Sequence, residues 1–157
     1  MKRDNTPVIA ADVADALAKW LGTKLPDHKL YQNDLPRRFT RPSVFLELIR
    51  ATSTPFSAGC TQEDALLTAT IFPERDEFED IDRTAARETS GAVVRALSGG
   101  YLMVRDRAVK IQSVTNTPDK DRTFIDVQFR WIEGRDLPDI TAELMEKLNL
   151  TIKERRD

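Results

Sequence analysis

Six acidic residues crowd into one short stretch, Ala69–Asp82, with the sequence ATIFPERDEFEDID. Clustered carboxylates could hold Mg²⁺ and support the hydrolysis of a phosphodiester. A magnesium site, however, draws its carboxylates from different elements, whereas these follow one another along the chain. At the start of a helix they would stabilise the positive end of the helix dipole, with Asp76 as the N-cap. We therefore interpret the stretch as a joint between a strand and a helix.

Other catalytic patterns are incomplete in this chain. A common phosphodiesterase core needs an Asp and then a Glu-x-Lys on the next strand, but after Glu47 the Lys position holds Ile49. Residues 126–128 fail in the same way. His28 is the single histidine and has no second ligand at zinc spacing, and Cys60 has no evident activating partner. The sequence thus predicts a protein that is not an enzyme and that binds no cofactor or metal.

The segment PRRFTRP, residues 36–42, places three arginines around one aromatic ring, between two prolines. One interpretation is a solvated loop. Another is a docking loop, because Arg and aromatic residues are enriched at the centres of protein interfaces. Nucleic acid is a weaker third candidate, since three arginines make a small footprint. The candidate interaction residues of this loop are Arg37, Arg38, Phe39 and Arg41.

The composition indicates a soluble globular protein. Of the 157 residues, 40% are hydrophobic and 32% are charged, and the net charge of -2 argues against a surface built throughout for nucleic acid. The single cysteine excludes an internal disulfide framework. No apolar run approaches the roughly 20 residues that span a bilayer, and Asp12 and Asp15 interrupt the N-terminal segment. Neither a membrane anchor nor a signal peptide is expected.

Two segments have the apolar spacing of amphipathic helices. The first is predicted over residues 7–21, with Thr6 as the N-cap and Gly22 as the C-terminal stop. The second is predicted over residues 77–98, ending at Gly99-Gly100. The apolar stripes are Ile9, Val13, Leu17 and Trp20 in the first helix, and Phe78, Ile81, Ala85, Thr89, Ala92 and Ala96 in the second.

The other periodic segments alternate as strands do. They cover residues 28–32, 43–50, 65–73, 101–104, 107–117 and 123–133. A Ser/Thr/Gly/Pro-rich segment, residues 51–64, is predicted to be the loop of a long hairpin. This order predicts an α+β fold, with an antiparallel sheet of about four to six strands and two amphipathic helices packed on one face. Residues 1–138 would form a single domain, and residues 139–157 a C-terminal extension, either a short helix or a strand used in assembly.

Four features follow one another in a familiar order. The N-terminal helix leads to KLYQNDLPRRFTRPSVFLELI, then to TATIFP before an acidic helix, and finally to TFIDVQFRWIE. In this order, over residues 8–152, the chain resembles the phage tail terminator (tail completion) proteins of tailed phages and phage-like elements.

The resemblance implies a structural virion protein without catalytic activity. Tail terminators form a ring, commonly a hexamer, on the last ring of the tail tube, where they stop tube growth and create the surface that joins the head. The expected partners are further copies of the chain, the tail tube protein, a head-tail connector or neck protein and, as a further candidate, the sheath protein. DNA would pass through the ring only as cargo. The expected location is the virion tail, assembled in the cytoplasm of the bacterial host.

Under this hypothesis, loops and chain ends supply the contacts that close the ring. The expected interface segments are residues 33–42, 51–64 and 139–157. The acidic joint would pair with the basic loop of the next subunit through Glu74, Asp76, Glu79 and Asp80. Two alternatives stay open: another neck protein, such as a head-completion protein or connector adaptor, and a small metal-dependent enzyme.

Overall fold

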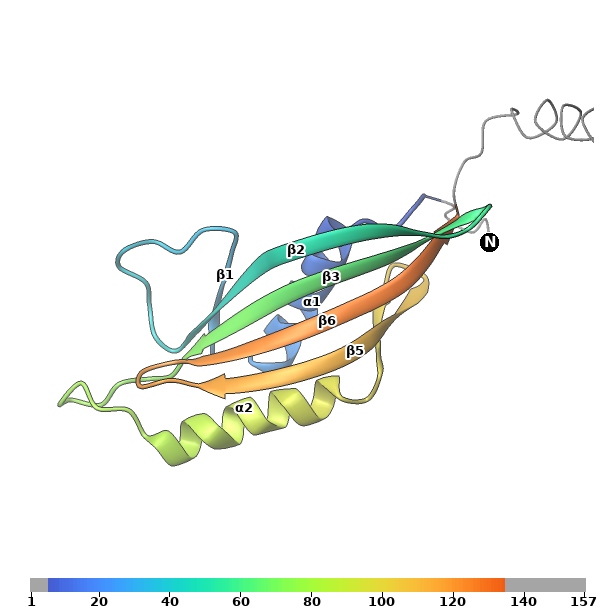
Figure 1. The fold of residues 1–157 in the computed structure, drawn as a ribbon. Coiled ribbons are helices and arrows are strands. Elements are labelled where there is room, and N and C mark those ends of the chain that lie inside the picture. Colours follow the sequence, from blue (N-terminus) through green and yellow to red (C-terminus); the bar gives the residue numbers. More distant parts are fainter. Residues whose placement is uncertain (1–5, 135–157) are drawn as a thin grey trace, which may run out of the picture.

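The structure, a computed structural model, describes residues 6–134. Its helices are α1 (Ala10–Lys24) and α2 (Arg83–Leu97). Its strands are β1 (Lys29–Gln32), β2 (Ser43–Ser57), β3 (Cys60–Phe72), β4 (Tyr101–Val104), β5 (Arg107–Pro118) and β6 (Thr123–Gly134). The strands form one sheet against which the helices pack (Figure 1). The predicted α+β class is confirmed, whereas the extension predicted at residues 139–157 lies outside the described residues.

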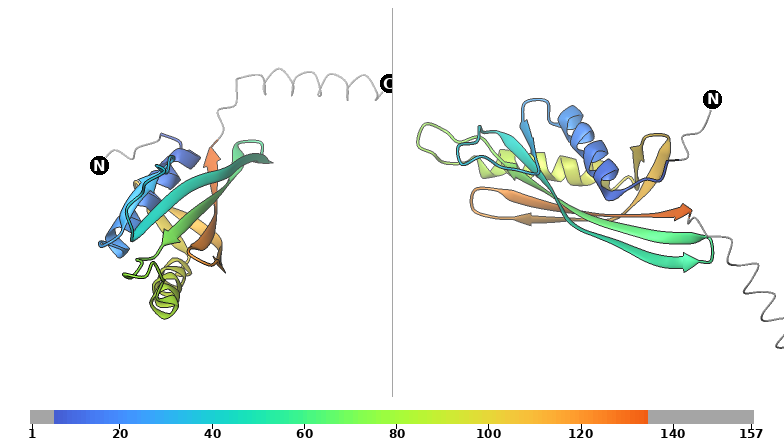
Figure 2. Two further views of the ribbon diagram at one scale, coloured as in Figure 1. Left: turned by 90° about the vertical axis from the view of Figure 1, so that its left-hand side faces the viewer. Right: turned by 90° about the horizontal axis from the view of Figure 1, so that it is seen from above.

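The sheet is mixed and curls into a half-barrel (Figure 2). Its strand order is β1-β2-β3-β6-β5-β4, and all neighbouring pairs are antiparallel except β1 with β2. The predicted antiparallel sheet is therefore confirmed from β2 to β4 and departs from the structure only at the β1 edge. The loop of residues 33–42 returns the chain to the end of the sheet where β1 began, so that Ser43 lies beside Lys29 and the two strands run parallel.

The core lies on the concave face of this sheet. On β6, Ile125, Val127, Phe129 and Trp131 are buried, whereas the intervening Gln128 and Arg130 are exposed, as the alternation predicts. Side chains from both helices join the same buried cluster, so both helices cover one face. The helical members are Val13, Ala14, Leu17, Ala18 and Leu21 from α1, and Val93 and Leu97 from α2. Each large apolar side chain buried in this way contributes about 1.5–3 kcal/mol.

The segment before α1 is fastened to the end of β6. The Trp131 Nε1–H donates to the carbonyl of Val8 at 3.2 Å, and the Val8 N–H donates to the buried Glu133 carboxylate at 3.0 Å. Glu133 also pairs with Arg107 on β5. The N-terminal segment is therefore anchored before the helix begins.

The predicted boundaries of the first helix are wrong by a few residues at each end. Its N-cap is Ile9 rather than Thr6, and the Ile9 N–H donates to Asp12 Oδ2 at 2.9 Å. Gly22 does not end the helix, since the Leu25 N–H still donates to the Leu21 carbonyl at 2.8 Å. The helix therefore continues to Lys24.

The acidic joint folds on itself instead of opening the second helix at residue 77. Asp76 Oδ1 accepts hydrogen bonds from the N–H groups of Phe78 and Asp80, both at 2.8 Å, which is the local turn that Asp favours outside helices. Glu79 lies in the left-handed region with φ 61°, and no residue inside a right-handed helix has this value. Phe78 is consequently exposed and lies outside the helix. Of the predicted stripe, Ala85, Ala92 and Ala96 are also exposed, and the buried residues of α2 are Ser90, Val93 and Leu97.

The second helix begins at Arg83, and its N-cap is Asp82 rather than Asp76. The Asp82 side chain accepts hydrogen bonds from the N–H groups of Thr84 and Ala85, at 3.1 and 3.2 Å. The first turn of α2 has no acidic residue. Among the acidic residues predicted to stabilise the helix dipole, Asp82 at the N-cap is therefore the one that is placed to do so.

Residues 51–64, predicted to be a loop, are strand. β2 and β3 pair through the whole segment, and the turn is confined to Ala58 and Gly59. Ser and Thr are compatible with a strand, and a two-residue turn that contains Gly is typical of a hairpin. The sequence of this part of β2 does not alternate between apolar and polar residues, because all residues of Glu47–Ser57 are exposed. A strand without a buried face needs no such alternation.

Candidate functional site

Arg41 of the predicted docking loop points into the protein. Its guanidinium donates to the carbonyls of Pro73 and Asp121, at 3.3 and 3.2 Å, and to Asp121 Oδ2 at 3.3 Å. It also lies 5.3 Å from the ring centres of both Phe39 and Phe72, which stand 4.4 Å apart. Only 14% of the Arg41 side chain is exposed. Arg41 and Phe39 therefore hold the loop to the sheet and are not presented to a partner.

The carboxylate of Asp121 accepts hydrogen bonds from three arginines, Arg41, Arg75 and Arg122. The hydrogen bond from Arg122 lowers the pKa of Asp121, and the same bond raises the pKa of Arg122. Burial lowers the pKa of Arg41, an effect that the neighbouring Arg75 reinforces and Asp121 opposes. This cluster ties the base of the loop of residues 33–42 to the turn between β5 and β6.

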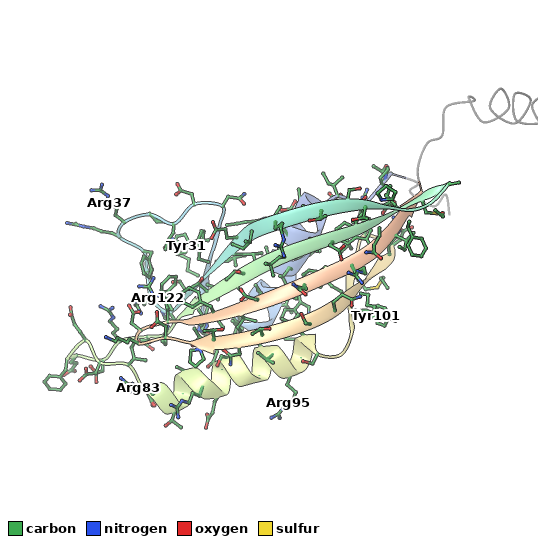
Figure 3. All side chains as sticks on the ribbon, viewed as in Figure 1. Tyr31, Arg37, Arg83, Arg95, Tyr101 and Arg122 are labelled. Atoms are coloured by element: carbon green, nitrogen blue, oxygen red, sulfur yellow. The ribbon has the colours of Figure 1, made fainter. Side chains whose placement is uncertain are left out.

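Arg37 and Arg38 are exposed at the outer part of the same loop, and Figure 3 shows Arg37 pointing away from the sheet. Within residues 6–134, neither of the two forms an ion pair. The loop is also braced on its inner side, because the Thr40 N–H donates to the Tyr31 hydroxyl at 3.0 Å. We call Arg37 and Arg38 the basic tip. Of the four loop residues that the sequence singled out, these two are available to a partner.

The four predicted acidic residues, Glu74, Asp76, Glu79 and Asp80, are all exposed. In the described part of the chain, none of them forms an ion pair with the basic loop, so the two predicted sets are not brought together within one copy. Glu74, Asp76 and Asp80 line a groove, and Glu79 is not among its lining residues.

This groove has a volume of about 720 Å³ and lies between the first turns of α2, the joint and the segment before β1. Its apolar lining includes Pro42, Ile71, Pro73, Ile81, Ala85 and Ala86. Its charged residues are Asp27, Glu74, Asp76, Asp80 and Asp82, together with Arg75. We call it the acidic groove. A groove lined by both apolar side chains and carboxylates has the complementary charge for a cationic partner.

His28 lines the acidic groove, and burial lowers its pKa from 6.5, while the charge of Asp27 acts in the opposite direction. Because the unfolded chain then binds the proton more readily, stability is expected to fall as the pH drops through about 6.5 and to level off below the folded-state pKa. Urea unfolding at about pH 7.5 and about pH 5.5 measures this change. His28 is the sole histidine of the chain, so His28→Asn should remove most of the dependence. An equal dependence in that variant would contradict the assignment.

The outer edge of β2 is an open surface that the sequence pattern missed. β1 covers only Ser43–Leu46, and beyond the hydrogen bond from Asn33 N–H to the Leu46 carbonyl no described residue pairs with this edge. The bare part, Glu47–Ser57, carries three large apolar side chains, Leu48 at 36%, Ile49 at 51% and Phe56 at 63% exposure. The Thr-rich run before the Gly-containing turn was the available signal for a longer hairpin.

Within residues 6–134, no three side chains of the His, Cys, Asp and Glu types lie close enough together to hold a metal ion. Neither helix of this part of the chain has the length and apolar character needed to cross a bilayer. Cys60 at the start of β3 is a partly buried free thiol.

Comparisons with known proteins add little. No family model matches the chain, and no curated protein matches it. One solved structure, whose name states no activity, is similar with a TM-score of 0.43 and 12% sequence identity, over 88% of this chain and 99% of the other. A similarity at this level carries no argument about function, which has to be argued from the surfaces of this chain.

Proposed function

We propose that this protein is a tail terminator of a tailed phage or phage-like element. In this role its ring caps the tail tube, stops tube polymerisation and presents the surface to which the head joins. The observation that carries the proposal is the bare outer edge of β2 over Glu47–Ser57. An uncovered strand edge of this length is a template for pairing with another chain, and soluble proteins usually cover or shorten such edges. A subunit that functions only after assembly has reason to keep its edge open.

The two edges of the sheet differ, and this difference favours a ring over a closed pair of subunits. α2 packs along β5 near one edge, whereas beyond β1 no described strand pairs with the outer edge of β2 (Figure 1). Contacts between two unlike surfaces repeat head to tail and close into a ring where the rotation permits. β2 has bulges at Ile49 and Phe56, so its backbone is regular only between these two residues. This limits which strands of another subunit can pair with the open edge of β2.

Native mass spectrometry and electron microscopy of the purified protein test the assembly. Rings of about six copies are expected from the proposed role. A protein that stays monomeric at every concentration and cleaves DNA in the presence of a divalent metal would support the enzymatic alternative instead.

Deleting the gene from its phage tests termination itself. Overlong or headless tails are the expected result, because nothing would then cap the growing tube. Tails of normal length that merely fail to join heads would assign the protein to another neck role, and normal tails on normal heads would contradict both.

A further inference from the structure

The acidic groove has more negative charge than the residues of the described range 6–134 neutralise. Its one lining guanidinium, Arg75, already pairs with Asp121. Asp82 and Asp76 are occupied by backbone N–H groups, but Asp27, Glu74 and Asp80 form no ion pair within residues 6–134. Carboxylates beside apolar side chains favour a ligand that brings both positive charge and an apolar stem. An arginine side chain has both.

The basic tip offers the complementary surface on a prepared support. Arg37 and Arg38 follow Pro36, and Phe39, Thr40 and Arg41 behind them are fixed to the sheet by ring, hydrogen-bond and ion-pair contacts. A braced loop loses little further conformational entropy when its tip is bound, which makes binding through the tip more favourable. The tip is therefore a ready-made ligand for an acidic site.

Within residues 6–134, the tip forms no ion pair with the groove of its own copy. In Figure 3, Arg37 and Arg83 lie on opposite sides of this end of the molecule, and Arg83 follows the groove residue Asp82 in sequence. We propose that the basic tip of one copy docks into the acidic groove of the next copy, an inference that rests on the proposed ring assembly. Because the two surfaces are different, the contact repeats head to tail around a ring, in addition to the pairing at the β2 edge.

Charge reversal tests the contact. Arg37→Glu/Arg38→Glu is expected to weaken assembly by about tenfold or more, since like charges would meet in the groove. Glu74→Arg/Asp80→Arg should weaken it to a similar extent. A chain that carries all four changes should recover assembly, because each reversed tip then meets a reversed groove. Sedimentation velocity of the full chain over a concentration series measures each variant, at about 50 mM and about 300 mM NaCl.

The matched control reverses two exposed cations elsewhere, Arg95→Glu/Lys110→Glu, which gives the same net charge as the tip variant. This control should assemble as the wild type does. Wild-type assembly by the tip variant, or failure of the fourfold variant to recover, overturns the docking of tip into groove. Loss of binding to the tube protein or to DNA by the tip variant, with rings intact, overturns it as well and assigns the tip to that partner. A wild-type chain that never assembles overturns the proposed function itself, so the two failures are distinguishable.

Discussion

The double variant Ile49→Asp/Phe56→Asp is expected to stay folded, lose the proposed ring assembly and sediment as a monomer. Both side chains are exposed and lie outside the core, so each replacement should cost the fold about 1 kcal/mol or less. In a strand-paired interface, by contrast, the new carboxylates would be desolvated without partners, at a cost of several kcal/mol. Assembly would therefore fail while the monomer survives. Sedimentation velocity and the urea midpoint, measured on the same samples, separate the two effects.

A matched control exists on β4. Tyr101 and Met103 are 65% and 60% exposed, so Tyr101→Asp/Met103→Asp makes the same two kinds of change away from β2. This control is expected to keep the ring. A β2 variant that retains the ring at wild-type stability would contradict the β2 edge as an assembly surface. Loss of the ring in both variants would show that added negative charge, and not its position, is responsible.

The core strands could be predicted from the sequence because one of their faces must be buried. On β6, a shift of one residue would bury Asp126 and Arg130 and expose Val127 and Phe129, so the hydrophobic pattern fixes both the strand and its orientation. Val13 and Leu17 of the stripe predicted for α1 are buried for the same reason, whereas Ile9 at the N-cap is exposed and Trp20 is partly buried. Where one face of a strand or helix is buried, the spacing of its apolar residues predicts the element.

The outer half of the hairpin and the start of α2 could not be predicted, because local interactions decide them. Residues beyond Glu47 are exposed on β2, so strand pairing leaves no apolar alternation there. In the joint, two hydrogen bonds to Asp76 and the left-handed Glu79 favour a turn over an early helix start. Acidic residues before a helix are compatible with both outcomes, so the helix dipole alone does not distinguish an early helix start from a turn.

The roles within the basic loop also depend on tertiary contacts. Arg37, Arg38 and Arg41 are alike in type and nearly adjacent, yet only Arg41 lies beside Asp121, which is 80 positions away in sequence. No local pattern distinguishes the arginine that supports the loop from the two that the loop presents. The predicted set of four interaction residues in this loop therefore includes two, Phe39 and Arg41, that support the loop.

Because Arg41 supports the loop, Arg41→Ala should destabilise the protein by about 2–4 kcal/mol. The change removes hydrogen bonds to the Pro73 and Asp121 carbonyls and a contact with Asp121 Oδ2, and it leaves Phe39 and Phe72 without the guanidinium that covers them. In urea, where slopes are about 1–3 kcal/mol per molar, the unfolding midpoint should fall by about 1–2 M.

Arg37→Ala is the matched control, since this side chain is exposed on the same loop and should change stability by no more than about 0.5 kcal/mol. Arg41→Lys separates the effect of the positive charge from that of the guanidinium geometry. It keeps the positive charge beside Asp121 but lacks the planar fork that bonds two carbonyls and lies against two rings, so its stability should fall between those of wild type and Arg41→Ala. Equal stability of Arg41→Ala and Arg37→Ala would contradict the anchoring role. If Arg41→Lys matched wild type, charge alone would account for the contact and the geometry would be irrelevant.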